Sequence, residues 1–105
     1  MSQSTTAQIS HFARRLDLPR DECLRLLASP LRRSALTYLA IHEEVIHLED
    51  LANMLAESED DIHEIEPIAI RLHHVHLPMM AASNILTYDS QTYEVDPVGV
   101  PSLAS

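Results

Sequence analysis

Residues 65–96 read IEPIAIRLHHVHLPMMAASNILTYDSQTYEVD, and the order of patterns in this stretch decides the predicted fold. Its first half repeats apolar residues at spacings of 3, 4, 3 and 4, which is the period of one face of an α-helix: Ile65, Ile68, Leu72, Val75 and Met79. Pro67 fits the first turn of such a helix, whereas Pro78 lacks a backbone donor near the far end and should bend the helix or loosen its last turns. Asn84 can adopt the left-handed conformation that ends a helix. We therefore expect a long amphipathic helix over about 67–83.

Two short runs rich in β-branched and aromatic residues follow this helix. They cover residues 85–89 and 92–96, with Ser90 and Gln91 between them, and Pro97 follows the second run. Two such runs on either side of a short polar turn indicate a β-hairpin. The second half of the stretch is therefore predicted to form a small antiparallel ribbon.

The chain before residue 65 shows helical patterns separated by proline signals. Ser29 can cap a helix in which Pro30 takes the first position. Helices are predicted over residues 7–16, from Pro19, from Pro30 to near His42, and over 49–57, with a short strand at 45–48. The predicted fold class is mainly α with a small β-hairpin, and the order of elements indicates a winged helix-turn-helix in which 49–57 and 67–83 form the helical pair. The predicted boundaries are 1–18 for an N-terminal tail and short helix, 19–96 for the domain and 97–105 for a C-terminal tail.

Composition narrows the possible functions. The 105 residues suit one domain, and 16 acidic against 7 basic residues give a net charge of −9. Every basic residue is arginine, a balance that we interpret as typical of an extreme halophile; the alternative is an ordinary acidic protein from a GC-rich genome. Gly99 is the only glycine, which excludes glycine-rich phosphate loops, and Cys23 is the only cysteine, which excludes an internal disulfide. Without a signal peptide or membrane-spanning run, we expect a cytoplasmic protein.

Two segments carry a resemblance to known families. Residues 27–36, LASPLRRSAL, resemble the opening helix of ArsR-like winged-helix repressors. Residues 72–78, LHHVHLP, continuing to NILTYD at 84–89, resemble a haloarchaeal family of small winged-helix domains of largely unknown function, and the likeness covers roughly residues 20–96. The chain departs from that family at 79–82, where Met-Met-Ala-Ala replaces basic and acidic residues, and at Asn84, where the family has glycine. The resemblance implies a DNA-binding transcription regulator.

The outward side of the predicted long helix is the candidate DNA-binding surface. With the apolar stripe turned inward, the residues expected on this side or at its edge are Arg71, His73, His74 and Leu77. Arginine and histidine can donate to base edges or phosphates. The hairpin turn, Ser90 and Gln91, is expected near the DNA backbone or minor groove. The alternative is a solvated polar face with no nucleic acid.

Two adjacent arginines form a second candidate contact with the DNA backbone. Arg32 and Arg33 follow Pro30, so they could hold a phosphate near a helix N-terminus. Alternatively, they could form internal ion pairs or tie their helix to the hairpin.

The remaining candidate partners are a second copy of the chain and a metal ion. We expect a homodimer that packs through the stripe Ile9, Phe12, Ala13 and Leu16; the alternative is that this stripe covers the domain's own core. His73 and His76 can share a helix face, but a closed metal site needs further ligands; we therefore predict no metal, with a metal sensor as a minor alternative. We predict no cofactor and no enzyme, and we expect double-stranded DNA as the partner. The alternative is a winged-helix protein–protein interaction module without DNA binding.

Overall fold

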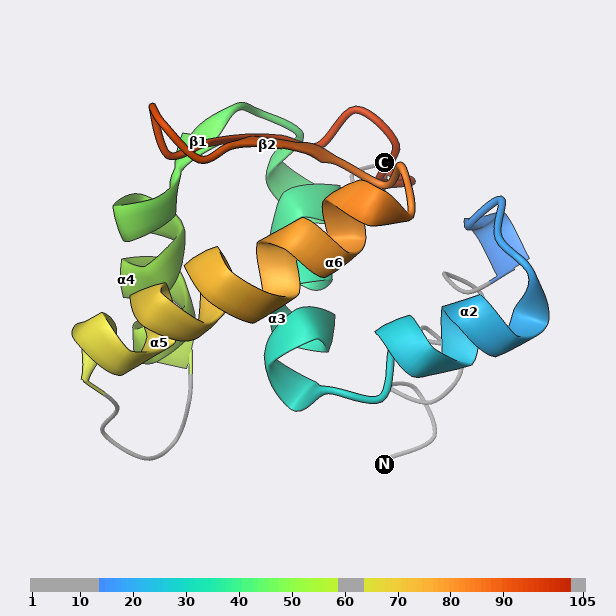
Figure 1. Cartoon of the computed structure of the whole chain (residues 1–105), viewed down its shortest axis with the longest axis horizontal. Helices are drawn as coiled ribbons and strands as arrows, with labels where there is room; N and C mark the ends of the chain where they lie inside the picture. The colour runs from blue at the N-terminus through green and yellow to red at the C-terminus, as the bar shows by residue number, and fades with distance from the viewer. Residues whose placement is uncertain (1–13, 59–63, 103–105) are drawn as a thin grey trace.

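The computed structural model describes residues 14–58 and 64–102 of the chain. These residues form helices and one small antiparallel sheet, so the prediction of a mainly helical fold is confirmed (Figure 1). The elements are α2 (Arg20–Leu26), α3 (Pro30–His42), β1 (Ile46–His47), α4 (Leu48–Ser58), α5 (Ile65–Arg71), the π-helical turn η1 (Leu72–His76), α6 (Leu77–Ala82), β2 (Thr87–Asp89) and β3 (Glu94–Asp96). No helix within the described residues has the length and apolar character that crossing a bilayer requires.

Local sequence signals start and end the helices as predicted. The Ser29 hydroxyl accepts a hydrogen bond from the Arg32 backbone N–H at 3.2 Å, and Pro30 takes the first position of α3. Asn84 has a φ of 61° just after α6, the left-handed conformation expected of it. Capping of this kind satisfies helix-end groups that would otherwise lack partners.

The core is formed by one cluster of apolar side chains shared by the helices and the sheet. In Figure 1, α5, η1 and α6 run as one continuous rod across the front of the molecule, and the sheet lies above it. The rod contacts α4 at its α5 end and β2 at its α6 end. The largest fully buried side chains are Leu26, Leu36, Leu39, Leu51, Leu55, Leu72, Leu77, Met80, Leu86 and Val95.

The rod turns a different face to the core from the one that its sequence period predicts. Of the five positions expected inside, Ile65 and Val75 are 40% and 52% exposed. Leu77, expected outside, is fully buried. From Leu72 onward the buried residues are His76, Leu77 and Met80, so the register after residue 72 was wrong by one residue.

The π-turn explains this shift. The Leu77 N–H bonds to the carbonyl of Leu72, five residues back, where an α-helix would bond to the residue four back. The turn thereby contains one extra residue. If that residue is left out of the count, His76, Leu77 and Met80 lie 3, 4 and 7 positions after Leu72, which is the ordinary spacing on one face of an α-helix. Pro78 follows at the start of α6; it has no N–H, and in an uninterrupted α-helix its ring would crowd the carbonyl of His74. The wider turn thus lies where the sequence predicted a bend.

The sheet has three strands in the order β1-β3-β2, all antiparallel. The predicted hairpin is confirmed, and the predicted short strand joins it because Ile46 pairs with Val95. The turn between β2 and β3 is longer than the predicted Ser90-Gln91: Tyr93 has a φ of 63° and its N–H bonds to the Asp89 carbonyl at 2.7 Å.

The segment after β3 packs against the domain. The Gly99 N–H bonds to the carbonyl of Ile85 at 2.7 Å, and Arg15 donates to the carbonyl of Ser102. A Cβ at Gly99 would lie 2.6 Å from the Asn84 carbonyl oxygen, so this close approach requires glycine. The stretch 97–102 is therefore part of the folded unit, although the sequence predicted a tail from residue 97.

Candidate nucleic-acid interface

The side of the rod that points away from the core is lined by exposed side chains. We call the following residues the outer face: Glu66, Pro67, Ile70, Arg71, His74, Val75 and Pro78. Ile70 is 51% exposed, and Arg71 is the only arginine on the rod. Arg71 and His74 are thus exposed as predicted, and the outer face combines one guanidinium, one imidazole and the carboxylate of Glu66 with an otherwise apolar surface.

His73 lies at the edge of the rod and faces the sheet. Its Nδ1 lies 2.6 Å from the Tyr88 hydroxyl in a hydrogen bond, and its ring centroid is 5.5 Å from that of Tyr93. The ring of His74 packs edge-on against it at 4.7 Å. Burial, Tyr93 and Asp89 together raise the pKa of Tyr88, so its hydroxyl keeps its proton. His73 therefore joins η1 to β2 and leaves His74 as the more accessible imidazole.

Leu77 does not belong to this surface. Its side chain has no exposed area, because the π-turn rotates it into the core beside Met80. The prediction that it faces a partner was wrong.

Arg32 and Arg33 bind the end of α2. Arg32 is 9% exposed; it donates from Nε to the Leu26 carbonyl at 2.7 Å, from Nη2 to the Arg25 carbonyl at 2.9 Å, and from Nη1 to His76 Nδ1 at 3.0 Å. Arg33 donates to the Leu27 carbonyl at 2.7 Å. Cations at the carbonyl end of a helix satisfy its unpaired acceptors. The interpretation of Arg32 as a phosphate contact was wrong, since these bonds hold its buried guanidinium inside the fold.

His76 is buried on the inner side of the π-turn, at 4% exposure. Its Nδ1 accepts from Arg32, and its Nε2 has no hydrogen-bond partner among the described residues. Burial lowers the pKa of His76, and the positive charges of Arg32 and Arg71 lower it further. His76 is therefore packed inside the fold with one of its two ring nitrogens hydrogen-bonded.

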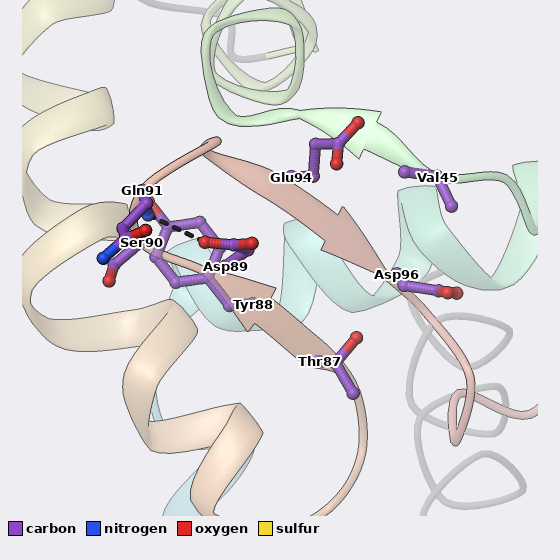
Figure 2. Close-up of a pocket in the computed structure, with 8 residues that line it drawn as sticks. All are labelled: Val45, Thr87, Tyr88, Asp89, Ser90, Gln91, Glu94 and Asp96. Carbon is purple, nitrogen blue, oxygen red and sulfur yellow. Dashed lines mark hydrogen bonds between the residues drawn. The ribbon is translucent and has the colours of Figure 1, made fainter.

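The hairpin presents an acidic surface. An open cleft of about 580 Å³ lies over the sheet, and its lining includes Asp89, Glu94 and Asp96 (Figure 2). Asp89 and Glu94 are direct cross-strand partners. Hydrogen bonds from the backbone N–H groups of Gln91 and Thr92 lower the pKa of Asp89 and keep it charged. The turn residues Ser90 and Gln91 are exposed, but they line the same cleft, so a phosphate near them would face these carboxylates.

The predicted dimer stripe is only partly within the described residues. Ile9, Phe12 and Ala13 lie outside them. Leu16 is 5% exposed and belongs to the core cluster. The stripe had two possible roles, a homodimer interface and a cover for the domain's own core. Leu16 has the second role.

The described residues contain no group of three His, Cys, Asp or Glu side chains placed to hold a metal ion. Cys23 is 6% exposed, and burial raises the pKa of its thiol, as is typical of a cysteine that packs as a small buried hydrophobe.

Comparison with known proteins gives one match. The family model described as "Domain of unknown function (DUF7344)" matches residues 24–96. The chain belongs to the DUF7344 family. No curated protein and no solved structure matches the chain. The predicted membership of a domain family of unknown function is confirmed, whereas the haloarchaeal origin and the relation to ArsR-like repressors stay predictions.

The DUF7344 span contains the whole rod and the whole sheet. It therefore includes the outer face, the Arg32–His76 contact and the hairpin turn, whereas the start of α2 and the packed segment around Gly99 lie outside it. The sequence did not single out Tyr88 and Tyr93 as partners of His73. Their place in a predicted hairpin beside a histidine-rich helix was the only available signal.

Proposed function

We propose that the chain is a DNA-binding transcriptional regulator of winged-helix type that acts as a homodimer at high salt. The observation that carries the proposal is the exposed outer face, with Arg71 and His74 on a rod that is braced by a small sheet at one end. The elements α4 and α5 would form the helical pair, the rod would enter the major groove, and β2 and β3 would form the wing. Two-fold symmetric binding of a palindromic site would then follow from dimerisation.

The charge distribution decides how such binding would work. The chain has a net charge of −9, Arg71 is the only arginine on the rod, and the sheet carries three carboxylates around its cleft. Affinity that comes from neutralised phosphates falls steeply with salt, by about 0.9 log units per log unit of salt for each phosphate. A protein with this surface would make few phosphate contacts. It would instead depend on a bidentate bond from Arg71 to a guanine edge, with apolar contacts from Ile70 and Val75.

The test is a selection for bound duplexes from a random-sequence pool, repeated from low to molar KCl, followed by affinity measurements on the selected site. We expect sequence-dependent binding with a shallow salt dependence. Arg71→Ala should weaken binding to the selected site by about 1–3 kcal/mol, which is about 5- to 150-fold, and relax the preference at one base pair. Arg20→Ala, on the exposed start of α2, is the matched control and should leave affinity unchanged. Absence of selection at every salt concentration would refute the proposal.

A protein–protein interaction module is the second candidate, and one observation favours it. Ile70 and Val75 leave the outer face largely apolar, which suits a protein partner as well as a base edge. In this case no duplex would be selected, and Ile70→Asp would abolish a stable complex with a protein partner while Arg71→Ala would not.

A further inference from the structure

Arg32 is a buried cation whose guanidinium donates, within residues 14–58 and 64–102, to three acceptors that are all uncharged. Two are backbone carbonyls at the end of α2, those of Arg25 and Leu26, and the third is Nδ1 of His76. One guanidinium thus joins the end of α2, the start of α3 and the π-turn. Burying a charge without a counter-ion is costly, so each of these acceptors is needed to keep Arg32 in place.

This geometry fixes the state of His76. Arginine has only donors, so Nδ1 of His76 must carry a lone pair and the ring must be neutral, with its proton on Nε2. A proton added to Nδ1 would remove the acceptor and place two positive groups 3.0 Å apart. The charged groups that act on His76 from the surrounding elements are Arg32 on α3 and Arg71 on α5, and both are positive. On α2, the Cys23 thiol is turned to the core and uncharged, and the half-buried Glu22 carboxylate accepts a hydrogen bond from the Ser83 hydroxyl just after α6 at 2.6 Å. On α4, which also contacts η1, the carboxylates of Glu49, Asp50 and Glu57 are exposed.

His76 also lies at the point where the rod changes from the π-helical turn η1 to the α-helix α6. It is the last residue of η1, and the bond from the Leu77 N–H to the Leu72 carbonyl closes the turn directly after it. The rotation of the rod that buries Leu77 and exposes Val75 thus also places His76 on the inner side, against Arg32. π-turns of this kind are frequently found at functional sites.

We propose that Arg32 and His76 form an acid-sensitive latch, in which neutral His76 holds the π-turn against α2 and α3 and protonated His76 releases it. Release frees the end of α2 and loosens the π-turn, which alters the arrangement of the outer face. The inference goes beyond the proposed function, because it holds for any partner of the outer face.

The direction of the pH effect follows from the lowered pKa of His76 in the folded protein. Below the ordinary value of 6.5 the opened form binds the proton more readily than the closed form, so closure weakens as the pH falls from 6.5 towards the folded pKa. One proton taken up on opening corresponds to a change of up to about tenfold in the opening equilibrium per pH unit.

Hydrogen exchange of the full chain, read amide by amide by NMR and corrected for the intrinsic exchange rate, tests the latch. As the pH falls below 6.5, the protection of the Leu77 amide and of the Leu27 amide, which bonds to the Cys23 carbonyl, should fall together by up to about tenfold per pH unit. The Leu48 amide, which bonds to the Tyr93 carbonyl in the sheet region, is the internal reference and should keep its protection. Equal loss at all three amides, or loss at none, would overturn the proposal.

Two matched variants separate the latch from general acid sensitivity. In His76→Asn the amide oxygen can accept from Arg32 but does not titrate, so the pH dependence at Leu77 should disappear. His74→Asn removes the neighbouring exposed histidine and should keep the wild-type dependence. A His76→Asn protein that still loses protection at low pH would contradict the latch. If this variant does not fold, the amide comparison in the wild-type chain decides.

Discussion

Gly99 is exposed and lies outside the helices and strands. Gly99→Ala is nevertheless expected to lower the free energy of unfolding by more than an ordinary surface substitution does. An ideal Cβ at this position would lie 2.6 Å from the carbonyl oxygen of Asn84 and 2.8 Å from that of Ile85. Both oxygens belong to the backbone at the end of α6, so neither can rotate away as a side chain would. Either the segment around Gly99 or the helix end must move.

The magnitude follows from the contacts that would be disturbed. Forcing an extra methyl group into a tight contact costs about 1–3 kcal/mol. Displacement of the segment would also lengthen the 2.7 Å hydrogen bond from the Gly99 N–H to Ile85, worth about 1 kcal/mol. We therefore expect a loss of about 2–3 kcal/mol in the free energy of unfolding, which lowers the Tm by roughly 10 °C for a chain of this size.

The assay is urea and thermal unfolding followed by circular dichroism. Val98→Ala is the matched control: its side chain is 66% exposed, and its loss should change stability by less than about 0.5 kcal/mol. If Gly99→Ala were as stable as this control, the segment 97–102 would not pack on the helix end, and the sequence-based interpretation of a tail would be correct.

Three further substitutions test other parts of the fold by the same unfolding measurements. Leu77→Ala should cost about 2–5 kcal/mol because the side chain is fully buried; a loss below about 0.5 kcal/mol would instead place Leu77 on the surface. Asn84→Gly should leave stability unchanged or slightly raised, whereas Asn84→Ala should cost about 1 kcal/mol because alanine is strained at a φ of 61°; equal effects would argue against the left-handed helix end. Tyr88→Phe should cost about 1 kcal/mol through loss of the bond to His73, and an unchanged stability would mean that this bond does not tie η1 to the sheet.

The elements of the fold were predictable because their signals are local. Ser29 and Pro30 start α3, Asn84 ends α6, and the β-prone runs form β2 and β3 as expected. Pairing of β1 with β3 joins Ile46 to Val95 across much of the chain. No local pattern specifies such a partner, so the sequence predicted the short strand and the hairpin but not the sheet that they form together.

The candidate site was predictable up to residue 74 and not beyond. Arg71 and His74 lie before the point at which the extra residue of the π-turn shifts the helical register, and both are exposed as predicted. Leu77 lies after that point and is buried. A fixed helical period cannot anticipate such a turn. The buried position of Arg32 was equally unpredictable. Two of its acceptors are backbone carbonyls, which every residue type has, so the sequence does not indicate which carbonyls Arg32 and His76 are placed beside.

The π-turn has a consequence for how this rod tolerates changes in length. Deleting one exposed residue between Leu72 and His76 would remove the wide turn and still place the same apolar side chains against the core, with the helix bent at Pro78. Two chains that differ by one residue here can thus share one interior while presenting differently spaced groups to the outside. Gain or loss of a single codon in this segment would therefore change the spacing of the exposed side chains on the rod while the same core side chains stay buried.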